Sequence, residues 1–457
     1  MQTLQQQKNY RYFGTLRRLL RRNAVPNIKK IINRIHPVDL AQVFTYFPSS
    51  DQTLLLSYID NSEKQSDILK ELNISMAKEI VEELGTEKSV KIICEMPPDD
   101  QADLLAALDE ELASEILAAM PQEDSDDVQD LMRYDEHSAG GIMNSDVLAI
   151  HMDSTVEEAT NKIQESQDVD LVFYIYVVDD YGSLMGVLSL RHLVVSKPGT
   201  IIKDVMNPNV VSVRPEEDQE DVARFVTKYD FLAIPVVDET NCLIGAVSVD
   251  DVIDVISDEA TEDILRMAGA GTGDGSSMTV SPFKHVLSRA PWLFAALIGG
   301  IIASLVIENY EHVLTKFLPV AAFIPVIIGM AGNVGTQSLA VVVRGLATNQ
   351  IKISNAWKVI GNEILVGLML GLVYGAILGA FGLMQFHGAP IPALNLAIAI
   401  GSATACAMIL AAMVASSIPL MFAKINIDPA VATGPFVTTA IDILGVFIYF
   451  TVVELVL

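Results

Sequence analysis

The chain has 457 residues, 51% of them apolar, and its mean hydropathy of +0.38 is high for a soluble protein. Its 57 acidic and 30 basic residues give a net charge of −27, so its surface would repel nucleic acid and attract cations. The charged residues crowd the first roughly 285 positions, which predicts an acidic soluble part followed by a membrane part.

A basic segment opens the chain, and its arginines flank three leucines at positions 16, 19 and 20: Arg17, Arg18, Arg21 and Arg22. This pattern is compatible with an amphipathic helix that lies near anionic lipid or an acidic face, although a solvated helix end is the preferred interpretation. No signal peptide is predicted, because the basic residues interrupt any apolar core.

The following segment, to about position 132, reads as successive helices. Three stretches share a proline, then acids, then a helical run: "HPVDLAQVFTYFP", "MPPDDQADLLAAL" and "MPQEDSDDVQDLM". Proline fits the first helical turn, and acids near it favour the helix dipole. The recurrence predicts a small all-α helical solenoid as an N-terminal cytosolic domain, residues 1–136.

A second repeat follows, in which "IMNSDVLAIHMDSTVEEATNKI" lines up with "VMNPNVVSVRPEEDQEDVARFV". Each copy predicts a β-α-β-β-α unit, at a period of about 60 residues. The pair closely resembles tandem α/β CBS domains, which sense adenosyl nucleotides, at residues 137–200 and 201–256. A linking helix and the Gly/Ser-rich hinge "AGAGTGDGSSM" are predicted within 257–283.

The remainder, 284–457, predicts a five-helix α transmembrane domain. Its hydrophobic blocks lie near Pro291–Ile307, Leu318–Val343, Val359–Met384, Leu394–Phe422 and Ala430–Val456. Basic residues gather before the first block and in alternate loops, which predicts a cytosolic N-terminal part and a C-terminus outside.

Polar groups inside apolar spans cost free energy unless they line water or find partners, so they nominate a transport pathway. The second span, "GMAGNVGTQSLAVVVRG", carries Asn333, Thr336, Gln337 and Ser338. Hydrogen bonding between helices is the alternative use of this cluster.

The fifth span opens with "NIDPAVATGPFVTTAIDILG", in which Pro435 removes a backbone donor and frees an upstream carbonyl. Asp442 follows with no Lys or Arg at its depth, so it is either protonated or faces a cation. Freed carbonyls and one carboxylate suit Mg2+, which keeps most of its waters. No His or Cys converges there, which argues against a site for Zn2+ or Cu+.

Together these features resemble the MgtE family of magnesium channels, over nearly the whole chain. The resemblance rests on the acidic helical domain, the CBS pair, the acidic linking helix and five spans with "GNVGTQS" and "DPAVATGPFVTTAIDILG". It implies a homodimer in the cell (inner) membrane whose second and fifth spans line one pore. It further implies that Asp442 binds hydrated Mg2+, helped by main-chain oxygens around Gly434 and Thr438, and we add Asn333 to this predicted pore set.

The acidic helix "DDVIDVISDEATEDILRM" has two interpretations. A charge run is ordinarily a solvated face, whereas facing carboxylates repel until divalent ions bridge them. In the resembled family this segment is a plug helix held shut by cytosolic Mg2+. The predicted regulatory ligands are Asp99, Asp100, Asp230, Asp251, Asp254, Glu259, Glu262, Asp263 and Asp428.

The resemblance also implies an ATP site at Tyr174, Arg191 and Phe231. The sequence departs from the family where His192 replaces the acid that holds the ribose. The carboxylate that accepts both ribose hydroxyls is therefore missing, which counts against ATP as a ligand.

Two rival functions remain open at this level. A proton- or Na+-coupled divalent cation exchanger would use Asp442 as a proton carrier, but such carriers usually hold more ionisable groups in their spans. A membrane-anchored CBS nucleotide sensor would need neither Asp442 nor the broken fifth span. No enzyme is predicted, since the sequence shows no P-loop, no phosphorylated-aspartate motif and no nucleophile–base pair.

Overall fold

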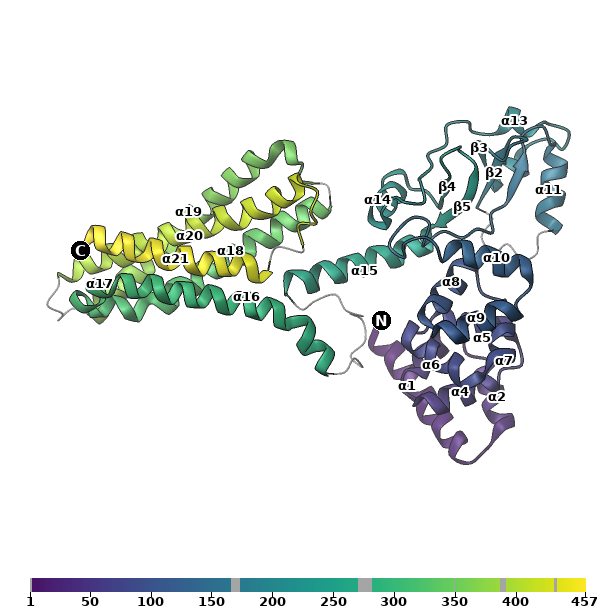
Figure 1. The fold of residues 1–457 in the computed structure, drawn as a ribbon, viewed down its shortest axis with the longest axis horizontal. Helices are drawn as coiled ribbons and strands as arrows, with labels where there is room; N and C mark the ends of the chain where they lie inside the picture. The colour runs from purple at the N-terminus through teal and green to yellow at the C-terminus, as the bar shows by residue number, and fades with distance from the viewer. Residues whose placement is uncertain (1, 166–172, 270–281, 349, 387–391, 431–433) are drawn as a thin grey trace. The chain divides into compact units, whose positions relative to one another are not determined.

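The computed structural model describes residues 2–165, 173–269, 282–348, 350–386, 392–430 and 434–457 (Figure 1). The chain forms two compact units, Met1–Ser257 and Asp258–Leu457, each with its own hydrophobic core. Residues 270–278 of the predicted hinge lie outside the described residues.

The first unit begins with short helices that stack in two rows. They are α1 (Gln2–Arg21), α2 (Val25–Ile32), α3 (Pro37–Phe44), α4 (Ser49–Ser57), α5 (Ser62–Lys70), α6 (Ile74–Leu84), α7 (Thr86–Ile93), α8 (Pro98–Ala107), α9 (Glu110–Ala119) and α10 (Gln122–Leu131). In one row α1 packs on α3, α3 on α5, α5 on α7 and α7 on α9, and in the other α4, α6, α8 and α10 follow one another. The predicted helical solenoid is confirmed.

Prolines and buried glutamines set the helix ends in this solenoid. Pro37 occupies the first turn of α3, where its missing N–H is not needed. The Gln52 side chain on α4 donates to the carbonyls of Phe44 and Phe47, each at 2.9 Å, and so satisfies the free carbonyls at the end of α3. Gln65 on α5 does the same for the end of α4.

Two strand–helix repeats follow. The first comprises β1 (Ala149–His151), α11 (Val156–Glu165), β2 (Tyr174–Val178), β3 (Leu184–Ser189) and α12 (Leu190–Val195), and α13 (Ile202–Val205) leads to the second, with α14 (Gln219–Tyr229), β4 (Ala233–Val237) and β5 (Leu243–Ser248). β1 runs parallel to β2, whereas β2–β3 and β4–β5 are antiparallel. Among the described residues, the first strand expected in the second repeat is reduced to one bridge, between Val213 and Val236.

The last helix of the second repeat is α15 (Val249–Met267), which continues without a break through the predicted domain limit at 256/257. Val252 and Val255 are buried in the same core as the solenoid helices. The first half of α15 is therefore fixed to the first unit, and its second half belongs to the second unit.

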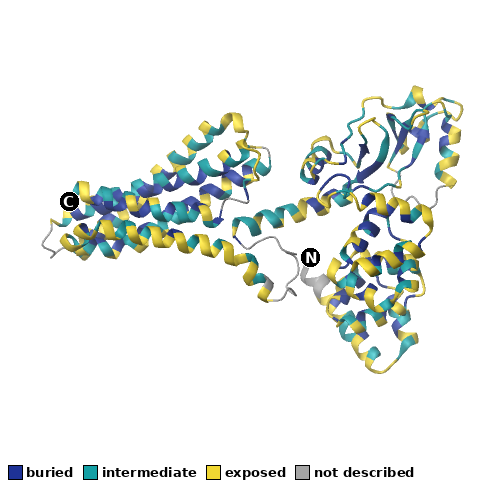
Figure 2. Ribbon diagram, in the orientation of Figure 1, coloured by how far each residue is buried: buried dark blue, intermediate teal, exposed yellow. Residues whose placement is uncertain are grey.

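The second unit contains α16 (Pro282–Asn309), α17 (Glu311–Lys316), η1 (Leu318–Phe323), α18 (Ile324–Ala347), η2 (Ile353–Asn355), α19 (Ala356–Gln385), α20 (Ala393–Lys424) and α21 (Gly434–Val456). Five segments of the described chain are long and apolar enough to cross a membrane: His285–Asn309, Leu318–Ala347, Ile353–Gln385, Ala393–Lys424 and Gly434–Val456. The five predicted spans are thus confirmed. Large apolar side chains such as Leu293 and Leu297 on α16 are exposed, as expected for a surface in lipid (Figure 2).

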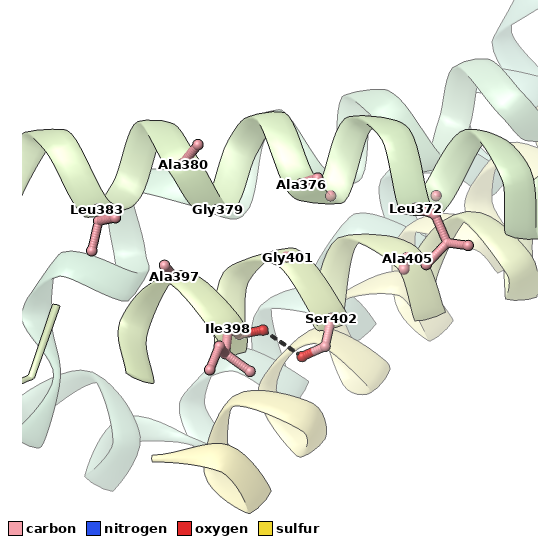
Figure 3. A pocket seen from close by; sticks show the side chains of 12 residues that line it. Leu372, Ala376, Gly379, Ala380, Leu383, Ala397, Ile398, Gly401, Ser402 and Ala405 are labelled. Atoms are coloured by element: carbon pink, nitrogen blue, oxygen red, sulfur yellow. Dashed lines mark hydrogen bonds between the residues drawn. The ribbon is translucent and has the colours of Figure 1, made fainter. Parts of the chain in front are cut away.

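Glycines let α19 and α20 approach closely. A Cβ on Gly375 would lie 2.4 Å from the Gly401 carbonyl oxygen, so only glycine fits there. An open groove of about 410 Å³ runs along this contact, past Leu372, Ala376, Leu383 and Ile398 (Figure 3). Its one hydroxyl, on Ser402, donates to the Ile398 carbonyl at 2.7 Å. An apolar groove of this kind offers no ligand to an ion.

Candidate functional site

An acidic group lies where α8 meets the start of α15. Asp99 is buried, with 8% of its surface exposed, and its Oδ1 has no hydrogen-bond partner among the described residues. Asp100 and Asp251 both act on Asp99 electrostatically. Lys70, the last residue of α5, places its Nζ 2.8 Å from Asp100 Oδ2. One lysine therefore faces at least three carboxylates.

These carboxylates resist ionising together. Burial, reinforced by the charges of Asp100 and Asp251, raises the pKa of Asp99 to about 8. Burial and the charge of Asp100 raise the pKa of Asp103 to about 6. Burial also raises the pKa of Asp251, against the opposing effect of the Ser248 hydroxyl that donates to it. Additional positive charge at this place would favour the ionised forms.

Three members of this group are missing from the residues predicted from sequence. Asp103 follows Asp99 by one helical turn on α8, and that spacing could have identified it. Lys70 and Glu71 end a different helix, and only the tertiary fold brings them here. Burial, and next the charge of Asp254 on α15, raises the pKa of Glu71.

Asp230 lies in a different setting. It ends α14 in the left-handed conformation, with φ of 54°, and its N–H donates to the Val226 carbonyl. Asp230 is exposed. The structure gives it a local role as a helix cap.

In the second unit, Arg266 bridges two of the predicted regulatory acids. It forms ion pairs with Glu262, one turn back on α15, and with Asp428, which precedes α21. The other oxygen of Asp428 accepts the Ala430 N–H at 2.8 Å. Glu259 and Asp263 lie four residues apart on the same stretch of α15. Sequence reasoning missed Arg266, although its i, i+4 spacing to Glu262 is a recognisable signal.

The end of α15 meets the start of α21 at close range. A Cβ on Gly434 would lie 2.1 Å from the Met267 carbonyl oxygen, and a Cβ on Gly269 would lie 2.6 Å from Pro435 Cγ. Any side chain at position 434 would therefore push the two segments apart. Gly434 has a packing role here besides the predicted one as a carbonyl ligand.

The predicted pore residues lie on two helices in contact, α18 and α21. Gly335 permits the contact, because a Cβ there would lie 2.2 Å from Ile441 Cδ1. Asn333, Thr336 and Gln337 share one face of α18 and are exposed in the single chain, and Asp442 on α21 is partly exposed. The Thr438 hydroxyl is already used, since it donates to the Gly434 carbonyl at 3.1 Å.

In the described parts of the chain, no group of three or more His, Cys, Asp or Glu side chains is arranged to hold a metal ion. The donor set is nevertheless chemically suited to a hard cation. The group around Asp99 consists of carboxylates that repel one another, and one carboxylate oxygen of Asp99 has no hydrogen-bond partner among the described residues.

Comparisons with known proteins agree along the chain. A family model described as a divalent cation transporter matches residues 324–452, a model of the MgtE intracellular N domain matches 35–137, and the CBS domain model matches 139–197 and 202–258. The magnesium transporter MgtE of Bacillus subtilis is 33% identical over 433 residues, which cover 94% of each chain. The same-named protein of Enterococcus faecalis is 41% identical over 331 residues, 72% of this chain and 71% of that one.

The chain belongs to the MgtE family. The likeness extends to solved structures of its soluble part. The cytosolic domain of the Mg2+ channel MgtE in complex with ATP is 34% identical, covers 53% of this chain and 99% of that one, and gives a TM-score of 0.51. The predicted fold class is thereby confirmed, as is the prediction of a non-enzyme, because the named relatives are transporters. The predicted domain limits stay predictions.

The three residues predicted to contact a nucleotide lie on separate elements of this MgtE chain. Tyr174 begins β2 and is partly buried, Arg191 is exposed on α12, and Phe231 stacks on Tyr229 with ring centroids 5.4 Å apart. Ser189 caps the N-terminus of α12, because its hydroxyl accepts the N–H of His192 at 3.3 Å.

Proposed function

We propose that this chain forms a Mg2+ channel that mediates magnesium uptake. Its membership of the MgtE family and the names of its relatives support this activity. The observation that carries the proposal is the uncovered polar face of α18, the helix that packs on α21, which carries Asp442. Exposing these polar side chains to lipid hydrocarbon would cost free energy, so a water-filled path or a second copy of the chain must cover this face.

The pore proposed here is lined by α18 and α21 of two copies related by a twofold axis. Each copy leaves Asn333 and Thr336 exposed, and a symmetric partner would enclose both sets; the Thr336 hydroxyl itself donates to the Gly332 carbonyl at 3.0 Å. Mg2+ is the substrate, and it keeps most of its waters in protein sites. Two Asp442 carboxylates facing a hydrated ion would supply charge without stripping that shell.

Replacement of Asp442 tests the pore. Asp442→Asn keeps the size of the side chain and removes its charge, so we expect Mg2+ uptake to fall at least about tenfold, the effect of losing about 1.4 kcal/mol of ion stabilisation. Uptake is measured in a magnesium-requiring strain and in proteoliposomes. Glu363→Gln, a carboxylate near the end of a span, is the matched control. Uptake by Asp442→Asn equal to that of the unmodified chain would refute the pore assignment. Cross-linking in proteoliposomes that detects only monomers would refute the twofold arrangement.

We further propose that cytosolic Mg2+ closes this channel. The repelling acids around Asp99 and Asp251 would be drawn together by a divalent ion, which favours one arrangement of α8 against α15. At its other end α15 packs directly on the start of α21, at Met267 and Gly434. A change in the position of α15 therefore acts on the helix that carries Asp442. Asp254, whose charge acts on Glu71 and Asp100, extends the same set. The regulatory roles of Asp230 and Glu259 stay predictions.

The proposed setting is the inner membrane, with the first unit in the cytosol and the C-terminus outside. The distribution of basic residues in the loops supports this orientation. For the nucleotide, we propose only a weak site at Tyr174, Arg191 and Phe231. The ATP complex formed by the cytosolic domain of a relative supports ATP as the ligand, and His192 removes a ribose acceptor from the proposed site.

A further inference from the structure

The chain opens with positive charge in an otherwise acidic protein. Residues 1–38 hold nine of the 30 basic residues and none of the 57 acidic ones. The transport and gating proposed above use none of these nine. Their separation from the acids is what a surface for a negatively charged partner requires.

Most of this charge lies on one face of α1. Arg11 and Arg18 are seven residues apart, and Arg17 and Arg21 are four apart, so helical geometry places all four on the same side. All four are exposed. Leu16, on the opposite side, is fully buried where α1 packs against α3. The side of α1 that carries Leu16 therefore packs against the other solenoid helices, and the side that carries the arginines faces solvent.

Two arginines of this face make local contacts: the Arg18 Nε–H donates to the Gly14 carbonyl at 3.1 Å, and Arg17 lies over the Phe13 ring. Two lysines of the segment form ion pairs, Lys8 with Asp39 at 2.9 Å and Lys29 with Asp60 at 2.5 Å. Within the described residues, no carboxylate pairs with any of the four arginines. Tyr10, on the same face, is 66% exposed. Basic residues with an exposed aromatic ring are typical of surfaces that lie at a lipid headgroup layer.

We propose that this basic face of α1, formed by Arg11, Arg17, Arg18 and Arg21, docks on anionic lipid headgroups of the membrane that the spans cross. The spans tether the face to a bilayer, which raises its effective concentration at the lipid surface. Clusters of four to eight Lys or Arg on an amphipathic helix are a recognised pattern for anionic lipid. A nucleic acid would instead have to approach a chain whose remaining surface carries 57 acidic residues.

A single tryptophan can report on this docking. The chain has two tryptophans, Trp292 and Trp357, both in the membrane unit. The full-length Tyr10→Trp variant with both replaced by Phe is reconstituted in nanodiscs that contain nitroxide-headgroup lipid. We expect quenching of the new tryptophan in discs with about 30% phosphatidylglycerol, weak quenching in phosphatidylcholine discs, and its loss at about 0.5 M NaCl.

Removal of three charges gives the decisive comparison. Arg17→Gln/Arg18→Gln/Arg21→Gln keeps helix propensity, and we expect it to weaken docking about fivefold per arginine. The matched control is Lys88→Gln/Lys91→Gln/Lys203→Gln, three exposed cations elsewhere on the first unit, which should quench like the parent. Thermal unfolding verifies that both variants are folded.

Three results would overturn the proposal. Equal quenching in neutral and anionic discs, or none in either, would show that anionic lipid is not the partner. Unchanged quenching in the arginine variant would show that the basic face is not the contact. Release of the quenching by a short polyuridine RNA at physiological salt would assign the face to nucleic acid.

Discussion

Replacing Asp99 by asparagine should stabilise the first unit when divalent ions are absent. Asp99 is almost completely buried beside Asp100 and Asp251, and its Oδ1 has no hydrogen-bond partner in the described structure. Asparagine has the same shape and no charge to lose. The substitution therefore removes the free-energy cost of holding this carboxyl protonated at neutral pH, while leaving the packing of α8 in place.

The size and sign of the effect follow from the pKa. Burial first, then the neighbouring charges, raises the pKa of Asp99 from 3.8 to about 8. Because the folded-state pKa lies above the unfolded one, the contribution to stability is full below pH 4 and is lost as the pH rises toward 8. At pH 7 the loss is about 4 kcal/mol, since each pKa unit corresponds to about 1.4 kcal/mol. For a unit of this size that equals a shift of roughly 10 °C in Tm.

The assay is thermal unfolding of the full chain in chelator, between pH 5 and pH 8. Unmodified protein should lose stability steadily over this range, whereas Asp99→Asn should show a much flatter profile and a higher Tm at pH 7. Added Mg2+ should raise the Tm of the unmodified protein and raise that of the variant less. Asp126→Asn, an exposed carboxylate on α10, is the control. Parallel pH profiles for Asp99→Asn and the unmodified chain would refute the reasoning.

Three further predictions concern gating and nucleotide binding. Gly434→Ala inserts a Cβ 2.1 Å from the Met267 carbonyl oxygen, so the variant channel should stay open in single-channel recordings at Mg2+ concentrations that close the parent channel. The control Gly445→Ala, where nothing lies within 4 Å of the added Cβ, should close as the parent does. Arg266→Gln frees Glu262 and Asp428 for Mg2+, so closure should require less cytosolic Mg2+, and a shift to higher Mg2+ would contradict this. His192→Asp restores a ribose acceptor, so calorimetry should detect ATP binding at least about fivefold tighter, as for one added hydrogen bond to a charged group; no gain would count against the site at Tyr174.

Much of the architecture was predictable because it depends on local patterns. The proline-then-acid recurrence that includes Pro37 gave the solenoid, and the duplicated strand–helix unit gave the CBS pair. The spans were found from length and apolarity alone. The missing first strand of the second repeat was not predictable, because the sequence around Val213 has the same alternation as its counterpart, yet only one bridge forms. Strand pairing depends on partners that lie far away in sequence.

The candidate sites divide in the same way. Asp442 and Asn333 were identified because a polar group in an apolar span is visible in sequence. Lys70 was missed because the end of α5 carries no sign that α8 and α15 will lie beside it. Asp230 was grouped with the other acids by charge; its left-handed backbone caps α14, and its regulatory role stays a prediction. Acidity is read from the sequence, whereas the partner of each acid is decided by tertiary packing.

The continuity of α15 has a mechanical consequence for the proposed gating. The helix has 19 residues and so extends about 28 Å, and no glycine or proline interrupts it between Val249 and Met267. Its first half is fixed by Val252 and Val255 in the core of the first unit, beside the acids that repel one another. Its last residue meets α21 through backbone atoms at Gly434, where no flexible side chain can absorb a displacement. A cation that moves α8 relative to α15 must therefore either bend a regular helix or displace the start of the helix that carries Asp442. If the helix stays regular, the displacement is passed to α21, and under the proposed gating that is how charge neutralisation around Asp99 would reach the pore.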